Sequence, residues 1–351
     1  MANAIILDEE QQQRLSHFMK RRQLNESMVT LLKRIKDDQD LKRGQITTAQ
    51  NATYDTIIES LTTSLNSGWV TTQQVVEILD GAEIAGRQHV CVFTVPDDLL
   101  EQVANSIQQP TTLNTQGVTL SEFWEIPKEP YTRLIQNNDR FLVMKIIAPR
   151  YYWISDENQP SEDLIEIVKQ REKERTAVII KLDRQDKILQ ARVPIREKAS
   201  NLDTTKSVYA YIVELVESQY GDDGVDWFNK LARFPLSEAF QKIIENRDDF
   251  ALYTDTPENQ HFKSSMSHKA AGDDAADIRD FEQWGFAEGF ARTSLRGAWT
   301  QGDNVIHVRM HAEKVKTGNQ MSREVCRLFF PRPCSDGQVE YVIERIQAHL
   351  P

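Results

Sequence analysis

The chain has 351 residues, of which 40% are hydrophobic and 27% charged, and its formal net charge at pH 7 is −11. This length suffices for two domains of ordinary size, and no apolar stretch approaches the length of a membrane span, so we expect a soluble two-domain protein without membrane association. The negative net charge argues against binding of polyanions over the whole surface, although a local basic face could still hold phosphates.

The amino-terminal residues and the cysteines favour a reducing compartment. The stretch "MANAIILDEEQQQ" has no basic leader before its short apolar run, so it does not resemble a secretory signal. The three cysteines, at positions 91, 326 and 334, are far apart and form no CxxC pair, so neither a disulfide framework nor a zinc site is indicated. We therefore expect a cytoplasmic protein with no metal and no cofactor.

The first part of the chain is predicted to be helical, because its apolar residues recur at spacings of three and four. Asn25 is the expected N-cap of the second helix, Gly68 ends the third, and Thr71 or Thr72 caps the fourth. The expected helices lie within residues 8–23, 25–38, 53–68 and 72–86.

The third and fourth helices, with the segment after them, have the outline of a helix-turn-helix unit. A glycine turn joins the two helices, and a short strand near residues 88–95 could form a wing behind them. However, residues 49–130 hold two Lys/Arg against eleven Asp/Glu, and "VVEILDGAEIAG" lacks the side chains that reach base edges. We therefore expect this helix to pack against the protein and not to read DNA.

Residues 125–130, "EIPKEP", are the predicted domain boundary, because proline disfavours helix and removes a hydrogen-bond donor. We expect a helical domain over residues 1–126 and an α+β domain over residues 130–351. The fold class is therefore α+β, with an all-helical N-terminal domain followed by an antiparallel-sheet domain.

The second domain is expected to contain strands, then helices, then strands and a closing helix. The segment 263–277 is predicted to be a disordered linker, and short glycine-containing turns in the last third suggest an antiparallel meander. The expected elements are a strand in 140–155, a hairpin in 175–195, a helix capped by Asp203 or Thr204 and ended by Gly221, further helix in 224–250, strands in 291–300, 304–316 and 323–331, and a helix in 338–350.

The stretch "GAEIAGRQHVCVFTVP" at residues 81–96 raises the question of an active site. His89 could act as a base oriented by Glu83, with Cys91 as the nucleophile. On a strand, however, His89 and Cys91 would be about 6.5–7 Å apart, and Arg87 could simply pair with Glu83 across one helical turn. We expect a structural joint between a helix and a strand here.

The C-terminal meander carries the candidate binding site. In "NVIHVRMHAEKVK" the cationic or titratable side chains alternate with apolar ones, so they share one face of a strand. Such a face suits phosphates or single-stranded nucleic acid, although it could also be an ordinary solvated surface. The candidate nucleic-acid-binding residues are Arg296, Trp299 as a stacking platform, His307, Arg309, His311, Lys314, Arg323 and Arg327.

Several enzyme signatures are absent from the sequence. It contains no GxxxxGK[ST], no GxGxxG after a strand, no HExxH and no GxSxG, and we assign no catalytic residue. The leading hypothesis is a non-catalytic binding protein that acts in a macromolecular assembly, with nucleic acid as the ligand of the basic face and a protein as a further partner. Two alternatives stay open: a metal-dependent phosphodiesterase or nuclease that uses dispersed carboxylates and a lysine such as Lys181, and a protein-interaction module that uses the acidic helical surface.

Overall fold

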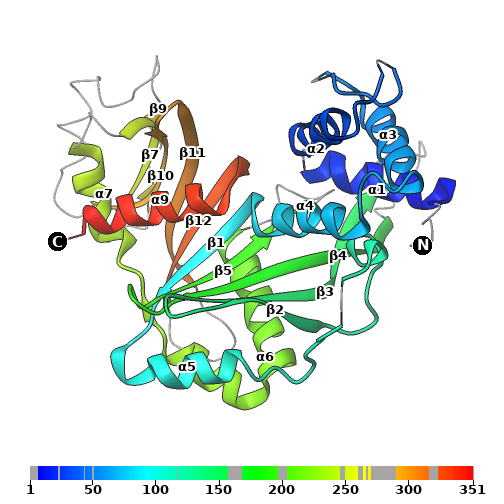
Figure 1. Ribbon diagram of the computed structural model, residues 1–351. Coiled ribbons are helices and arrows are strands. Elements are labelled where there is room, and N and C mark those ends of the chain that lie inside the picture. Colours follow the sequence, from blue (N-terminus) through cyan, green and yellow to red (C-terminus); the bar gives the residue numbers. More distant parts are fainter. Residues whose placement is uncertain are drawn as a thin grey trace, which may run out of the picture. The chain divides into compact units, whose positions relative to one another are not determined.

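The computed structural model describes residues 7–22, 24–42, 44–49, 51–116, 118–156, 168–196, 204–245, 250–259, 264–265, 268–269, 290–315 and 323–350. Helices open the chain and a large antiparallel sheet with further helices follows, so the predicted α+β fold class is confirmed (Figure 1). The chain divides into two compact units. Unit 1 consists of Met1–Gly86, Thr115–Glu129 and Ala148–Thr176, and unit 2 of Arg87–Asn114, Pro130–Ile147 and Ala177–Pro351.

Unit 1 is built mainly from amphipathic helices whose apolar sides share one core. The 3-10 segment η2 (Leu120–Phe123) adds Phe123 to this core, where its ring meets Phe18 edge-on with centroids 5.5 Å apart. Edge-to-face contact is a favoured arrangement of aromatic rings. The helices are α1 (Glu9–Arg22), α2 (Asn25–Asp38), α3 (Tyr54–Asn66) and α4 (Thr72–Ile84), drawn in blue to cyan in Figure 1.

The beginning of α4 and the end of α3 follow their sequence signals. Thr71 accepts a hydrogen bond from the backbone N–H of Gln74, whose side chain accepts one from the Thr71 N–H, which completes a capping box. After α3, Gly68 has a φ of +70°, the left-handed conformation that glycine adopts at little cost. Thr71 is therefore the cap, and the predicted role of Gly68 is confirmed.

The predicted N-cap of α2 is wrong. The helix already includes Asn25, and Leu24 occupies the N-cap position without a side-chain hydrogen bond. The Leu24 carbonyl accepts from the N–H of Met28, while its own N–H donates to the carbonyl of Met19. A backbone hydrogen bond to the last turn of α1 therefore holds the N-cap residue of α2 in place, and no side chain caps the helix.

Unit 2 is organised by the antiparallel sheet, to which twelve described strands belong. Ten of them follow the order β2-β3-β4-β5-β1-β12-β11-β10-β7-β8, while β6 (Ala232–Arg233) pairs with β1 and β9 (His268–Lys269) with β7. The other strands are β1 (Gly86–Thr94), β2 (Tyr131–Asn137), β3 (Phe141–Asp156), β4 (Val168–Asp183), β5 (Ile188–Pro194), β7 (Phe250–Asn259), β8 (Ser264–Ser265), β10 (Phe290–Gln301), β11 (Asn304–Val315) and β12 (Arg323–Cys334).

The strand predicted near residues 88–95 lies in the middle of this sheet. It is β1, which pairs with β5 on one side and β12 on the other, and its residues from Arg87 onward belong to unit 2. Unit 1 also takes residues from the chain after 126, so the compact units interleave along the sequence. Most of the predicted linker 263–277 lies outside the described residues.

One face of the sheet is covered by α7 (Leu236–Glu245) and α9 (Asp336–Ala348); we call it the α9 face. Its core includes apolar side chains from β1, β10, β11 and β12, such as Val92, Trp299, Met310 and Leu328, packed against α7 and α9. Figure 1 shows both helices beside the strands β7 to β12. Because each Å² of buried apolar surface stabilises a fold by about 25 cal/mol, this core is a main source of stability for unit 2.

The opposite face carries α6 (Thr205–Lys230) and is called the α6 face. Phe93 of β1 points to it and meets Phe228 of α6 with ring centroids 5.2 Å apart. Gly221, expected to end a helix, has non-helical φ and ψ of +63° and −157°, so one helix ends there and a second continues from the kink to Lys230 within α6. A shorter helix, α5 (Leu100–Ile107), contacts α6.

None of the helices in the described ranges combines the length and the apolar composition needed to cross a bilayer.

Candidate functional site

The three C-terminal strands form the expected antiparallel meander. Arg309 of β11 lies directly opposite Arg296 of β10 and Phe329 of β12. Directly opposite residues of antiparallel strands project to the same face of a sheet. These three side chains therefore stand side by side on the α6 face.

His89 of β1 extends this series across a fourth strand. Its ring stacks on Phe329 with centroids 4.8 Å apart and planes inclined by 26°, while the Arg309 guanidinium carbon lies 5.5 Å from the Phe329 ring centroid. Since β12 lies between β1 and β11, His89 and Arg309 flank the ring from opposite sides. We call the series His89–Phe329–Arg309–Arg296 the transverse row.

Two positively charged side chains of the transverse row, Arg296 and Arg309, lie directly opposite each other. Among the side chains that the structure describes, which exclude those of residues 253–259, no carboxylate forms an ion pair with Arg296 or Arg309. The pKa of Arg309 is lowered from its usual value, first by burial and then by the charges of Arg296 and Arg327. Like charges directly opposite on neighbouring strands are destabilising. An anion placed between Arg296 and Arg309 would relieve this repulsion.

The two histidines of β11 are neutral at pH 7. The pKa of His307 is lowered by partial burial and by the charges of Arg332 and Arg296. For His311, burial, together with Arg327, His89 and Arg309, lowers the pKa to about 3, although the Glu313 carboxylate lies 3.4 Å from its Nδ1. Positive charge at this site therefore comes from the arginines.

Arg327 lies on the α6 face but is almost completely buried. Its Nε donates to Thr205 Oγ1 at 2.8 Å and its Nη1 donates to His89 Nδ1 at 3.1 Å. A guanidinium has no acceptor, so His89 Nδ1 must accept and the proton of the neutral ring must be on Nε2. Arg327 thus connects β12, β1 and the beginning of α6 beneath the site.

Arg323 has a structural environment at the other end of α6. Its guanidinium donates to the carbonyl oxygens of Phe228 and Leu231 and lies 5.1 Å from the Phe93 ring centroid. Cations at the C-terminus of a helix satisfy its last carbonyl groups. Arg323 therefore stabilises the end of α6.

Trp299 and Lys314 do not join the transverse row. The Trp299 side chain is fully buried in the core of the α9 face, where its ring centroid lies 4.5 Å from that of Phe250. Lys314 is exposed near the end of β11, opposite Glu324, and strand alternation puts it on the face of Met310. Of the eight predicted site residues, the structure brings Arg296, His307 and Arg309 together at accessible positions, with His311 and Arg327 more deeply placed beside them.

Sequence reasoning missed His89 and Phe329 as members of this site. Alternation along β12 places Phe329 on the same face as Arg327, and this signal was available. No local pattern could predict that His89 stacks on Phe329, because the two residues are 240 positions apart in the chain (329 − 89).

The stretch at residues 81–96 is organised as a joint. Glu83 forms a buried bidentate ion pair with Arg175, and Arg87 donates instead to the carbonyl oxygen of Pro331, so the suggested pairing of Arg87 with Glu83 is wrong. Burial raises the pKa of the Cys91 thiol to about 12. The thiol is therefore protonated at pH 7 and unsuited to be a nucleophile.

Lys181, the lysine considered for a nuclease site, belongs to an ion-pair network on the α9 face. Its Nζ lies 3.0 Å from Asp336 and 2.9 Å from Glu340, and Arg192 lies 2.6 Å from each of the same carboxylates. Burial would raise the pKa of Asp336, but the charges of Arg192 and Lys181 and their hydrogen bonds lower it. Two cations thus balance two carboxylates, which explains the network as a support for the start of α9.

In the described part of the chain, no three His, Cys, Asp or Glu side chains are grouped so that they could hold a metal ion.

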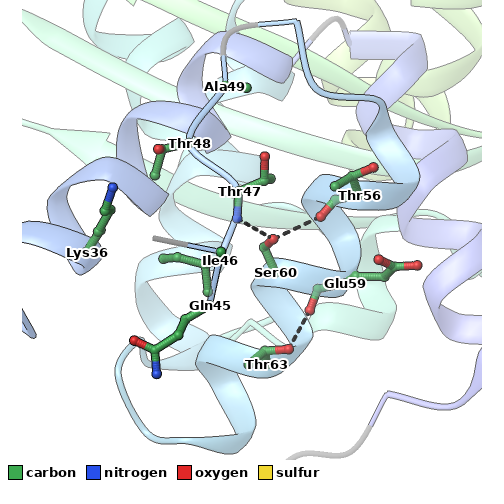
Figure 2. Close-up of a pocket in the computed structure, with 11 residues that line it drawn as sticks. Lys36, Gln45, Ile46, Thr47, Thr48, Ala49, Thr56, Glu59, Ser60 and Thr63 are labelled. Atoms are coloured by element: carbon green, nitrogen blue, oxygen red, sulfur yellow. Dashed lines mark hydrogen bonds between the residues drawn. The ribbon is translucent and has the colours of Figure 1, made fainter. Parts of the chain in front are cut away.

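A pocket of about 580 Å³ lies in unit 1 between α2, α3 and the loop 44–49 (Figure 2). Figure 2 shows that two of its hydroxyl groups are engaged within the protein: Ser60 donates to the Thr56 carbonyl and accepts from the Thr47 N–H, and Thr63 donates to the Glu59 carbonyl. One basic side chain, Lys36, and one acidic side chain, Glu59, line the pocket.

Comparisons with known proteins give no family. No family model and no curated protein matches the sequence. A solved structure described as an Ntf2 like protein involved in plasmid conjugation is similar at 10% identity over 69% of this chain and 90% of that chain, with a TM-score of 0.11. At this TM-score the likeness carries no argument about fold or function.

Proposed function

We propose that this chain is a non-catalytic cytoplasmic binding protein that acts in an assembly with other macromolecules and binds nucleic acid through the transverse row. The observation that carries the proposal is the direct opposition of Arg296 and Arg309, which have no carboxylate partner among the side chains that the structure describes. Phosphate groups satisfy such arginines by charge and by bidentate hydrogen bonds. The partly buried ring of Phe329, with the buried His89 stacked on it, adds an aromatic side chain beside Arg309.

The proposal is tested by removing the two opposed arginines. We expect an affinity loss of about tenfold for Arg296→Ala and of more than about tenfold for Arg309→Ala, because each arginine contributes charge-assisted hydrogen bonds and Arg309 also packs on the Phe329 ring. The slope of log K against log salt should fall by about one for each arginine. Fluorescence anisotropy with a labelled oligonucleotide, between about 50 and 200 mM salt, measures both quantities.

Lys314→Ala is the matched control, because it removes one exposed positive charge from the other face of the same strand. It should change the affinity by less than about twofold. If the two arginine variants bound as tightly as the wild type, the transverse row would not be the binding site.

The pH dependence of binding should report on His307. Its pKa in the free protein lies below the usual value, because burial and then Arg332 and Arg296 disfavour the imidazolium. A bound phosphate favours the imidazolium, so the complex takes up protons and the affinity should rise as the pH falls from about 8 to about 5.5. Anisotropy titrations at several pH values measure this rise. His307→Ala should flatten the profile, and an unchanged profile in this variant would exclude His307 as its source.

A further inference from the structure

We infer that the nucleic acid bound at the transverse row is single-stranded and that one of its bases stacks on the guanidinium of Arg309. This inference rests on the proposed function and specifies its ligand. It is carried by the packing of Arg309 against Phe329 together with the position of α6 on the same face.

Arg309 is positioned by a ring and not by hydrogen bonds. Its guanidinium carbon lies 5.5 Å from the Phe329 ring centroid, and Phe329 is in turn backed by His89 at 4.8 Å. Within the described residues, Arg309 makes no hydrogen bond, and its Nε is buried without a partner. The contact with Phe329 therefore holds the guanidinium in place and leaves its terminal N–H groups to a ligand.

A guanidinium held in this way can serve two parts of a nucleotide. Its plane can support an unstacked base, and its N–H groups can donate to a phosphate. Arg296, directly opposite on β10 and exposed, can bind the next phosphate. Bases are free to stack on protein side chains only where they are not paired and stacked within a duplex.

The position of α6 also favours a single strand. The hydrogen bond from Arg327 to Thr205 places the first turn of α6 on the α6 face beside β12, next to the transverse row. A helix with its side chains is about 10–12 Å thick. A stiff duplex lying on the sheet would meet this helix, whereas a flexible single strand can follow the sheet past it.

Arg309→Lys tests the inference because lysine keeps the charge and lacks the plane. The wild-type affinities for a labelled single-stranded oligonucleotide, for its duplex and for inorganic polyphosphate are compared with those of Arg309→Lys and of the matched variant Arg296→Lys. We expect the wild type to prefer the single strand to the duplex. Arg309→Lys should bind the single strand about tenfold more weakly, within the range measured for the loss of one stacked base, and should weaken polyphosphate binding no more than Arg296→Lys does.

Arg296→Lys should weaken the binding of all three ligands by the same small factor, because it keeps the charge and loses only the bidentate geometry toward phosphate, which all three ligands contain. Equal wild-type affinity for duplex and single strand, or an Arg309→Lys variant that keeps the single-strand affinity, would overturn the inference and leave the proposed function standing. If the wild type bound no nucleic acid, the proposed function itself would fail. Circular dichroism of each variant confirms that it is folded.

Discussion

Replacing Trp299 with alanine is expected to lower the free energy of unfolding of this protein by about 3–5 kcal/mol. Trp299 is fully buried, lies directly opposite Phe250 on the neighbouring strand, and contacts its ring. Truncation removes the transfer free energy of a large ring and leaves a cavity that the surrounding core fills only in part. Chemical denaturation followed by circular dichroism measures the change.

The residues around Trp299 are so closely packed that they can fill little of the cavity left by the substitution. Gly297 sits two residues before Trp299, and a Cβ atom there would overlap the Ala251 carbonyl and the Phe250 ring, so the backbone and this ring are already in close contact. Val305→Ala, an exposed position on the adjacent strand, is the control and should change stability by less than about 0.5 kcal/mol. A loss below about 1 kcal/mol in Trp299→Ala would contradict the buried position of the ring.

Replacing Glu83 with alanine is expected to destabilise unit 1 by about 3–5 kcal/mol. Glu83 and Arg175 are both almost completely buried and are joined by two hydrogen bonds. Removal of the carboxylate leaves the Arg175 charge desolvated without its partner, a larger cost than the net contribution of the pair. Urea unfolding of the variant, monitored by circular dichroism, provides the measurement.

A double-mutant cycle separates the ion pair from other effects. Glu83→Ala combined with Arg175→Met should recover most of the lost stability, since no uncompensated charge then remains buried. Arg87→Ala, which removes an exposed side chain with one hydrogen bond, should cost only about 0.5–1.5 kcal/mol. Additive effects of Glu83→Ala and Arg175→Met would show that the two residues are not coupled.

Periodicity along the sequence predicted the elements in which a local pattern coincides with burial. The helices at the start of the chain and the strands of the C-terminal meander have regular apolar spacing, and the structure has them at nearly the predicted bounds. β7 was missed, because "FALYTDTPEN" is polar, contains a proline and comes directly after a stretch whose sequence predicts helix. Its strand conformation depends on pairing with β10, about 40 residues later, which no local pattern reveals.

The candidate site was predictable in part for the same reason. Alternation along β11 put His307 and Arg309 on one face, and the structure shows them there with Arg296. Trp299 lies three residues after Arg296 on β10, so its side chain projects to the opposite face of the sheet. The residue types in the strand did not by themselves show which of the two faces is buried. Arg323 and Arg327 form hydrogen bonds with α6, and the position of α6 on this face depends on tertiary packing, which the local sequence pattern does not show.

β1 determines how far this chain can be shortened. In the described sheet, β1 lies between β5 and β12 and joins them. Seven of its residues pair with β5. A fragment that starts after Thr94 would leave the backbone edges of β5 and β12 open, and bare edges of this kind recruit other chains into aggregates. Expression of the C-terminal region in a soluble form therefore requires a start point upstream of Gly86.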